Sequence, residues 1–396
     1  MSTNQFLEQL AGILPDERLL VRQEDLAPYE CDALTALREK PLAVAIPETE
    51  DEILKLLEAC RQHSIAVVTR GAGTGLSGGA RPVAGALLVS MMRFNRILEV
   101  DEENLTALVE PGVRNLAISE AVADKGLYYA PDPSSQLACS IGGNVAENAG
   151  GVHCLKYGLT VHNIVGLKVI TIDGHVHTLG NNTLESPGYD LTALMNGSEG
   201  MLAMITEIRV RLRVKPPIVR VILAAFDDIE QAGNAVSTII KAGIVPAGLE
   251  MMDGDAIKAV EDFAHAGYPL DAQAILLCEL DGLEAEVNAQ IETVTALLNE
   301  QGATEVRTSR DDQERMRFWA GRKSAFPAVG RISPDYYVMD GTIPRAALGT
   351  VLKQIGAWSK EIGLSVANVF HAGDGNLHPL ILYNGNIPGE VEKAEE

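Results

Sequence analysis

The stretch RGAGTGLSGGA, residues 70–80, places five glycines in eleven residues directly after the apolar run IAVVT. Gly73, Gly75 and Gly78 have the G-x-G-x-x-G spacing of a nicotinamide-dinucleotide site, which also requires a helix at the last glycine and an acidic residue ending the next strand. Pro82 rules out that helix, and the next strand ends without an acidic residue. No G-K-[ST] follows, so a Walker phosphate loop is excluded as well.

The loop instead lies between two predicted strands, where its glycines let the backbone approach an anion closely. The side chains of Arg70, Thr74 and Ser77 add hydrogen-bond donors. A flexible surface turn is the alternative, but five glycines lose more conformational entropy than a simple turn requires. We therefore predict that this loop binds phosphate.

A second glycine-rich loop is predicted at SIGGNVAENAGG, residues 140–151. Its small residues allow the backbone to pack against a planar ligand, and Ser140, Asn144 and Asn148 supply neutral hydrogen-bonding groups. The stretch NGSEGMLAMITE, residues 196–207, has the same character. Separate loops of this kind within one domain suit a long ligand with a diphosphate in its middle.

The order of predicted elements divides the chain at Pro216–Pro217. The first 40 residues are predicted to be helical. A helix over 49–63, beginning at a Thr49–Glu52 capping box, is then flanked by strands to form a β-α-β unit. Strands and helices alternate over 219–302, which predicts an antiparallel α+β domain with helices on one face.

Composition favours an ordinary globular protein of two or three domains, with 396 residues and 46% hydrophobic content. The formal net charge of −22 argues against non-specific binding to nucleic acid or anionic lipid. No signal peptide or membrane-length apolar run is evident, so we expect a cytoplasmic protein. Five cysteines form no C-x-x-C pair and are expected to be buried free thiols. They are Cys31, Cys60, Cys139, Cys154 and Cys278.

Several motifs together resemble a known family of flavoproteins. PLAVAIPETEDEILKLLEAC, RGAGTGLSGGA, PDPSS, SIGGNVAENAGG and GSEGMLAMITE follow the order found in the FAD-binding domain of the vanillyl-alcohol oxidase and p-cresol methylhydroxylase superfamily. FWAGRKSAFP, MDGTIPR and HAGDGNLHP are similar to motifs of the flavin-linked D-2-hydroxyacid dehydrogenases, and most of all to the glycolate-oxidising members. The resemblance covers nearly the whole chain.

The resemblance implies an α+β fold, with an FAD-binding domain of two α+β subdomains followed by an antiparallel α+β cap domain of ferredoxin-like type. We expect an N-terminal segment over 1–37, the FAD-binding domain over 38–217 and the cap domain over 218–396. The implied cofactor is non-covalent FAD, although His153 offers a site for covalent attachment. The implied FAD-binding residues are Arg70, Gly71, Gly73, Thr74, Gly75, Leu76, Ser77, Gly78, Pro131, Ser135, Ser140, Gly142, Gly143, Asn144, Asn148, Gly150, Glu199 and Ile205, the last two near the adenosine.

Oxidation of a 2-hydroxy acid requires a cation for the carboxylate, removal of the hydroxyl proton and a hydride acceptor. Arg322 matches the family's carboxylate clamp, because a guanidinium binds two oxygens at once. The alternative is an exposed arginine on an acidic helix, with Lys323 a solvated neighbour.

HAGDGNLHP places His371 and His378 on either side of a Gly-Asp-Gly turn. By the family match they are ligands of a divalent metal, Zn, Mn or Fe, with Asn376 contacting substrate or orienting a ligand. Histidines without a functional role in a turn are the alternative.

The resemblance also implies a later Glu-His-Gly segment, which supplies a third metal ligand and a general base, and the sequence ending at Glu396 does not contain it. We therefore expect a C-terminally truncated family member. An inactive fragment, or a non-catalytic FAD-binding or assembly component, is the alternative to an enzyme. Glu390, Glu392, Glu395 and Glu396 are predicted to begin a helix.

The expected reaction is FAD-dependent oxidation of a small D-2-hydroxy acid, first glycolate to glyoxylate and second D-lactate to pyruvate. A 2-hydroxyglutarate substrate is less favoured, since no second basic residue lies near YYVMD, residues 336–340. The sequence has no iron–sulfur cysteine pattern, so electrons must pass to another component. The resemblance implies an FAD-binding partner subunit and an iron–sulfur subunit, or a quinone or cytochrome chain, with at most peripheral association at the inner membrane.

Overall fold

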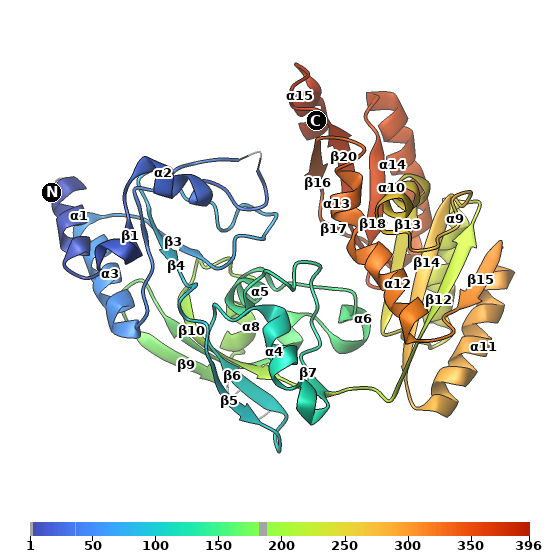
Figure 1. Ribbon diagram of the computed structural model, residues 1–396, viewed down its shortest axis with the longest axis horizontal. Helices are drawn as coiled ribbons and strands as arrows, with labels where there is room; N and C mark the ends of the chain where they lie inside the picture. The colour runs from blue at the N-terminus through green and yellow to red at the C-terminus, as the bar shows by residue number, and fades with distance from the viewer. Residues whose placement is uncertain (1–2, 36, 182–187) are drawn as a thin grey trace. The chain divides into compact units, whose positions relative to one another are not determined.

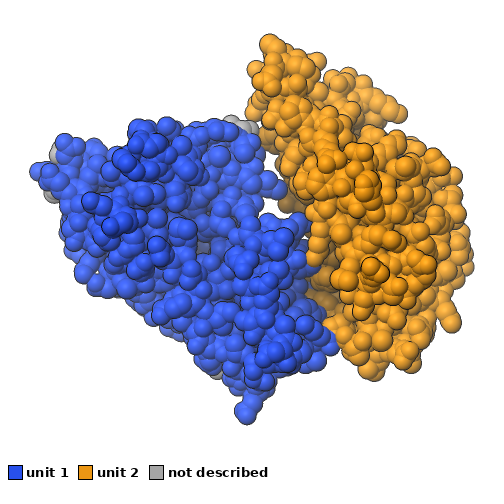
Figure 2. Space-filling model, in the orientation of Figure 1, with its two compact units in different colours: residues 1–151, 158–215 blue, residues 152–157, 216–396 orange. Residues whose placement is uncertain are grey.

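The computed structural model describes residues 3–35, 37–181 and 188–396, so Met1, Ser2 and position 36 of the predicted N-terminal segment lie outside it. The chain forms two compact units, shown in two colours in Figure 2. Unit 1 comprises Met1–Gly151 and Gly158–Lys215, and unit 2 comprises Val152–Tyr157 and Pro216–Glu396. The chain thus enters unit 2 briefly, returns to unit 1, and leaves it again beside the double proline.

The first sheet of unit 1 has four strands in the order β1-β2-β4-β3, of which β2, β4 and β3 are parallel. Helix α3, Glu50–His63, connects β2 to β3 and begins at Thr49, whose side chain forms the predicted capping box with Glu52. Helix α1, Thr3–Ala11, buries Phe6 and Leu10 in the same core as α3. The strands are β1 (Leu19–Leu20), β2 (Ala43–Ala45), β3 (Val67–Arg70) and β4 (Leu87–Ser90).

The sequence predicted a helical N-terminal segment, but this segment is not helical throughout. β1 pairs with β2 and α1 shares its core, so both belong to the packing of unit 1. The helices before Ala43 are otherwise short. They are α2 (Gln23–Leu26), η1 (Asp16–Arg18) and η2 (Ala27–Tyr29).

The second sheet of unit 1 has five antiparallel strands in the order β5-β6-β10-β8-β9 (Figure 1). The predicted hairpin at Asp173–Gly174 joins β8 to β9, and Gly174 adopts φ +85° there. The strands are β5 (Ile97–Asp101), β6 (Thr106–Val109), β8 (Ile164–Ile170), β9 (Val176–Gly180) and β10 (Met204–Arg211), with the separate pair β7 (Leu127–Tyr128) and β11 (Arg213–Val214). The remaining helices of unit 1 are α4 (Asn115–Ala121), η3 (Ala123–Lys125), α5 (Ile141–Glu147), α7 (Thr160–Asn163) and α8 (Leu191–Met195).

Helix α5 corrects the prediction that residues 140–151 form a loop throughout. Ser140 caps the helix, since its side chain accepts a hydrogen bond from the N–H of Gly143 at 3.3 Å, and Asn148 ends it in the left-handed conformation at φ 49°. Gly142 is needed for packing, because a Cβ there would lie 2.5 Å from the Cβ of Pro111. The glycines that suggested a loop thus permit close approach of a short helix.

Unit 2 is built on a seven-stranded sheet in the order β15-β12-β14-β13-β18-β20-β16, whose pairings are antiparallel. The strands are β12 (Ile218–Phe226), β13 (Gly248–Asp253), β14 (Ala274–Gly282), β15 (Glu305–Thr308), β16 (Asp335–Val338), β18 (Val366–Phe370) and β20 (Pro379–Tyr383), with the pair β17 (Gly341–Thr342) and β19 (Asn376–Leu377) beside them. The helices are α6 (Cys154–Tyr157), α9 (Ile229–Lys241), α10 (Gly254–Ala264), α11 (Glu284–Glu300), α12 (Asp312–Lys323), α13 (Ala325–Val329), η4 (Arg345–Ala347), α14 (Leu348–Ile362) and α15 (Glu390–Glu395).

Helices cover both faces of this sheet, so the prediction of helices on one face is wrong. In β12, Val221 and Leu223 pack in a core with α10 and α12, while Ile222 and Phe226 pack in a second core with α9, α11 and α14. The physical reason is that neither face of β12 meets water, so this strand is apolar at consecutive positions.

Four of the five cysteines are buried and Cys31 is half-buried, and all five are free. This confirms the prediction of free thiols. Among residues 3–35, 37–181 and 188–396, no helix combines the length and apolar character needed to cross a membrane.

The carboxylate of Glu52 provides a test of how unit 1 is stabilised. It accepts two hydrogen bonds of 2.7 Å from Arg18 and one of 2.7 Å from the N–H of Glu48. The hydrogen bond from Arg18 is the main cause of a pKa below the ordinary value for this carboxyl, although partial burial opposes it. A depressed pKa gives stability that is present above the ordinary glutamate pKa and is lost as the pH falls.

We expect Glu52→Gln to lower the stability of unit 1 by about 1–2 kcal/mol at pH 7 and by less at pH 4, measured as shifts of the urea unfolding midpoint. Asp51→Asn, a change of an exposed carboxylate in the same turn, is the control and should cost less than about 0.5 kcal/mol. A deficit for Glu52→Gln that grows on acidification would contradict the assignment.

Candidate functional site

The three glycine-rich segments converge within unit 1. A Cβ on Gly71 would overlap the hydroxyl oxygen of Ser140, and one on Gly79 would lie 2.8 Å from a carboxylate oxygen of Glu147. The third segment joins through the N–H of Glu199, which donates to the carbonyl of Ala146 at 2.8 Å. Segments far apart in the sequence therefore form one backbone-rich surface.

Arg70 contacts the backbone around this surface. Its guanidinium lies beneath the loop and donates from Nη1 to the carbonyls of Cys31 at 2.8 Å and Ala80 at 3.3 Å. Gly73 packs so closely on the guanidinium that a side chain there would overlap it. Arg70 is 8% exposed. It thereby links the start of the loop, at Arg70, to its end at Ala80.

A polar network beneath α5 connects other predicted residues. Asn115, 2% exposed at the start of α4, donates from Nδ2 to the carbonyl of Pro131 at 3.0 Å and to Oδ1 of Asn144 at 2.9 Å. Sequence reasoning missed Asn115; the available signal was an amide at the first position of a predicted helix. The side chain of Asn148 is also used internally, since its Oδ1 accepts from the N–H of Val161 at 3.0 Å.

Two further predicted FAD-binding residues, Ile205 and Glu199, differ in their exposure to solvent. Ile205 lies in the hydrophobic core between the second sheet and its helices. Glu199 is exposed and adopts φ 52°. The neighbouring Glu147 receives a hydrogen bond from the hydroxyl of Ser77 at 3.3 Å, and burial together with the charge of Glu199 raises its pKa. The glycine-rich segments also include Thr74, Gly75, Leu76, Gly78, Gly143 and Gly150, all half-buried.

A second group of predicted residues meets in unit 2 around one buried carboxylate. Glu250, on the central strand β13, is 1% exposed. Its Oε2 lies 2.7 Å from Nη2 of Arg322, and its Oε1 lies 2.8 Å from Nδ1 of His371. Arg322 comes from the last turn of α12, and His371 directly follows β18. Three separate elements thus place a guanidinium and an imidazole on one carboxylate.

Arg322 is itself 1% exposed, which overturns the alternative that it is an exposed helix residue. Its Nε and Nη2 have no hydrogen bond of good geometry within the described part of the chain, despite the short ion pair with Glu250. Buried guanidinium donors are costly unless an acceptor is present. This arrangement fits a site for an anion. Lys323, the next residue, is exposed as predicted.

The turn after β18 brings the two predicted histidines together. His371 and Asn376 exchange backbone hydrogen bonds of 3.0 and 3.2 Å across the turn, with Gly375 at φ +80°. The rings of His371 and His378 are perpendicular with centroids 5.2 Å apart. Nδ1 of His378 lies 3.5 Å from Oδ1 of Asp340, and the buried Oδ1 atom of the half-buried Asn376 has no hydrogen-bond partner among the described residues.

Electrostatic coupling shifts the pKa values of the groups around Glu250. Burial alone would raise its pKa, but the charges of His371 and Arg322 outweigh burial, so the pKa lies below the ordinary value. Burial would lower the pKa of His371, and the adjacent Glu250 carboxylate raises it instead. At Asp340, burial would raise the pKa, but the hydrogen bond and charge of His378 outweigh burial and lower it.

The donor chemistry of the two imidazoles suits a divalent metal, but they do not complete a site. Within residues 3–35, 37–181 and 188–396, no three histidine, cysteine or carboxylate side chains are grouped so as to hold a metal ion. No reaction step is therefore derived through a metal.

His153 also lies in unit 2, in the short segment Val152–Tyr157. Its Nε2 is 2.8 Å from Oε1 of Glu279, and the indole N–H of Trp319 on α12 donates to Oε2 of the same carboxylate. Lys156 and Tyr157 bind the nearby Asp281. These contacts anchor the segment and helix α12 to strand β14.

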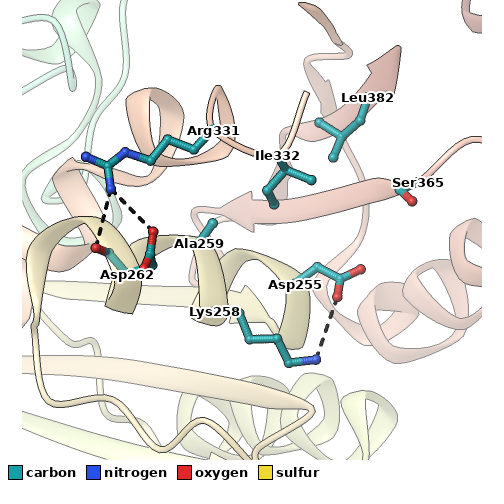
Figure 3. A pocket seen from close by; sticks show the side chains of 8 residues that line it. All are labelled: Asp255, Lys258, Ala259, Asp262, Arg331, Ile332, Ser365 and Leu382. Atoms are coloured by element: carbon teal, nitrogen blue, oxygen red, sulfur yellow. Dashed lines mark hydrogen bonds and ion pairs between the residues drawn. The ribbon is translucent and has the colours of Figure 1, made fainter. Parts of the chain in front are cut away.

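A shallow pocket of about 400 Å³ lies elsewhere in unit 2 (Figure 3). Its charged side chains pair with one another: Arg331 lies 3.3 Å from Asp262, and Lys258 lies 3.9 Å from Asp255. None of the predicted site residues lines it.

Two family models match the chain: one described as "FAD binding domain" over residues 41–180, and one described as "FAD linked oxidases, C-terminal domain" over residues 215–396. The glycolate oxidase subunit GlcD of Escherichia coli strain K12 is 60% identical over 383 residues, which cover 97% of this chain and 77% of that relative. The chain belongs to the FAD-linked oxidase family. The resemblance found in the motifs is thereby confirmed.

Other members of the family are more distant. The GlcD subunit of Bacillus subtilis strain 168 is 38% identical, covering 100% of this chain and 84% of the relative. A D-lactate dehydrogenase of Anaerostipes hadrus is 29% identical, covering 99% of this chain and 84% of the relative. Among solved structures, p-cresol methylhydroxylase with substrate bound gives a TM-score of 0.82 at 18% identity, covering 99% of this chain and 85% of that chain. This likeness confirms the predicted fold class.

The contact between Gly71 and Ser140 can be tested by a pair of substitutions. Gly71→Ala should lower the stability of unit 1 by about 1–3 kcal/mol, since its Cβ would overlap the Ser140 hydroxyl. Adding Ser140→Ala removes the obstructing oxygen and should restore part of that loss, even though it also removes a helix cap.

Urea unfolding of the two single variants and the double variant measures this coupling. Gly356→Ala in α14 is the control, because a Cβ there meets open space. Strictly additive effects of the two changes would contradict the packing described here.

Proposed function

We propose that the protein oxidises a small D-2-hydroxy acid with FAD, with glycolate the first candidate and D-lactate the second. The observation that carries this proposal is the fully buried Arg322, with unsatisfied donors beside a pair of imidazoles. The names of relatives support it, since GlcD subunits and a D-lactate dehydrogenase share this chain's family.

The cofactor is assigned to the converging segments of unit 1. The cradle that they form is so tight that side chains at Gly71 and Gly79 would collide with neighbours, which fits a backbone surface shaped for a diphosphate. We propose that Gly71–Gly78 holds the diphosphate, with Pro131, Asn144 and Asn148 near the flavin. FAD, when bound, supplies the hydride acceptor.

The chemistry of the substrate matches the spacing around Glu250. A 2-hydroxy acid carries its carboxylate and its hydroxyl on adjacent carbons, so a cation and a lone-pair nitrogen must lie close together. Arg322 and His371 meet that requirement because both contact one carboxylate, at 2.7 and 2.8 Å. Arg322 would bind the substrate carboxylate, and the two imidazoles would lie beside its hydroxyl.

We also propose His371 and His378 as two ligands of a divalent cation, Zn, Mn or Fe, with further ligands from outside the described cluster. Electrons would pass to an FAD-binding partner subunit and an iron–sulfur subunit. The proposed location is the cytoplasm, with at most peripheral association at the inner membrane.

The central test is anaerobic reduction of the purified flavoprotein. The flavin absorbance of the wild-type protein should bleach on addition of glycolate or D-lactate. Arg322→Lys keeps a positive charge beside Glu250 but loses the planar fork, so the apparent Kd for substrate should rise at least about tenfold for each charged hydrogen bond lost.

Arg317→Gln, on the same helix but 48% exposed in its side chain, is the matched control and should bind substrate normally. Flavin that is bound but not reduced by any 2-hydroxy acid would overturn the proposal in favour of a non-catalytic FAD-binding component.

We further propose that FAD is bound without a covalent link. The histidine considered for covalent attachment, His153, has its Nε2 on the Glu279 carboxylate. Acid precipitation of the holoprotein should leave all flavin in the supernatant, measured by its fluorescence. Flavin that stays with the protein pellet, and that is released by His153→Ala, would contradict this.

A further inference from the structure

We infer that Glu250 is a positioning residue, which fixes the imidazole of His371 in one tautomer and thereby sets the rate of substrate oxidation; this inference rests on the proposed function. Glu250 occupies β13, between β14 and β18 in the sheet, and neither motif that carries Arg322 or the histidines includes it. Its carboxylate contacts both Arg322 and His371.

The hydrogen bond decides which ring nitrogen of His371 faces the site. A carboxylate only accepts, so Nδ1 at 2.8 and 3.0 Å from its two oxygens must carry the proton. In the neutral ring the lone pair is then on Nε2, the nitrogen turned away from Glu250. That lone pair is what the ring must present to any group that it binds in the site, whether a divalent cation or a hydroxyl.

The same carboxylate serves a second donor. Nη2 of Arg322 lies 2.7 Å from Oε2, so the two oxygens are shared between a guanidinium and an imidazole. Glutamine keeps one accepting oxygen and has an N–H₂ group in place of the other. Because a guanidinium can only donate, we expect the accepting oxygen to face Arg322 and the N–H₂ group to face His371. In Glu250→Gln, an amide N–H facing Nδ1 would drive His371 into the opposite tautomer, with its proton on Nε2.

In Glu250→Gln, the affinity for an anion should change much less than the rate of substrate oxidation. Removing the negative charge of Glu250 strengthens the attraction of Arg322 for an anion, which offsets the lost ion pair. Arg322 also remains packed in the last turn of α12 at 1% exposure. A role confined to holding the fold together would weaken binding and catalysis alike, so the two effects must separate if Glu250 acts through His371.

The experiment compares wild-type holoprotein, Glu250→Gln and Asp253→Asn. At saturating 2-hydroxy acid, Glu250→Gln should slow flavin reduction roughly 10²–10⁴-fold, the range expected for a wrong histidine tautomer. Its Kd for oxalate, a dianion with no C–H bond to oxidise, should stay within about threefold of wild type or become tighter, by calorimetric titration. Loss of oxalate binding in parallel with activity would overturn the inference, and so would an unchanged reduction rate.

Asp253→Asn is the matched control. Asp253 is a buried carboxylate on the same strand, but it accepts two hydrogen bonds of 2.8 Å from Asn368 and one of 3.0 Å from the N–H of Ala256. Its replacement should lower the thermal midpoint while leaving both the reduction rate and the oxalate Kd within about twofold of wild type, since it touches neither His371 nor Arg322.

A measurement on the wild-type protein covers the case in which Glu250→Gln does not fold. In a ¹⁵N-histidine-labelled sample at pH 9, the signal lost in His371→Asn should show a proton on Nδ1 and a lone pair on Nε2. The opposite tautomer, or a doubly protonated ring, would overturn the inference. If the wild-type flavin is not reduced by any 2-hydroxy acid, the proposed function fails, while the tautomer still decides whether Glu250 orients His371.

Discussion

Burying a carboxylate in the middle of a sheet costs several kcal/mol unless donors and positive charges surround it. Glu250 is placed in that position on β13, and its two partners come from elements that are far apart in the sequence. The cost of an unpaired carboxylate therefore ties α12 and the turn after β18 to the centre of unit 2. The guanidinium of Arg322 is under the same constraint, because without Glu250 it would be a buried charge that lacks this partner.

Much of the architecture follows from local patterns in the sequence. The capping box of α3, the β8–β9 hairpin and the alternation of elements after Pro216 depend on neighbouring residues, which sequence reasoning reads directly. Motifs likewise located Arg322, His371 and His378, because a turn or a helix end carries each of them. That the glycine-rich segments meet one another was inferred from a shared ligand, and the structure places them together.

What the sequence did not reveal depends on long-range contacts. Glu250 lies in the apolar run AGLEMMD, where nothing local distinguishes a buried functional carboxylate from a polar residue at a strand edge. Residues 140–147 have the composition of a loop, and only packing against Pro111 explains a helix rich in glycine. The second layer of helices on the unit 2 sheet was signalled by consecutive apolar residues in β12, a pattern that alternation of elements alone does not capture.

The brief excursion of the chain at Val152–Tyr157 has a consequence for how such proteins can be assembled in evolution. Glu279 and Asp281 on β14 are almost fully buried. Glu279 pairs with His153, and Asp281 pairs with Lys156 and Tyr157. A gene fusion that joined the residues after Pro216 to an unrelated partner would leave these two acids without those contacts. The double proline thus marks a change of unit, but the residues after it do not make up the whole of unit 2.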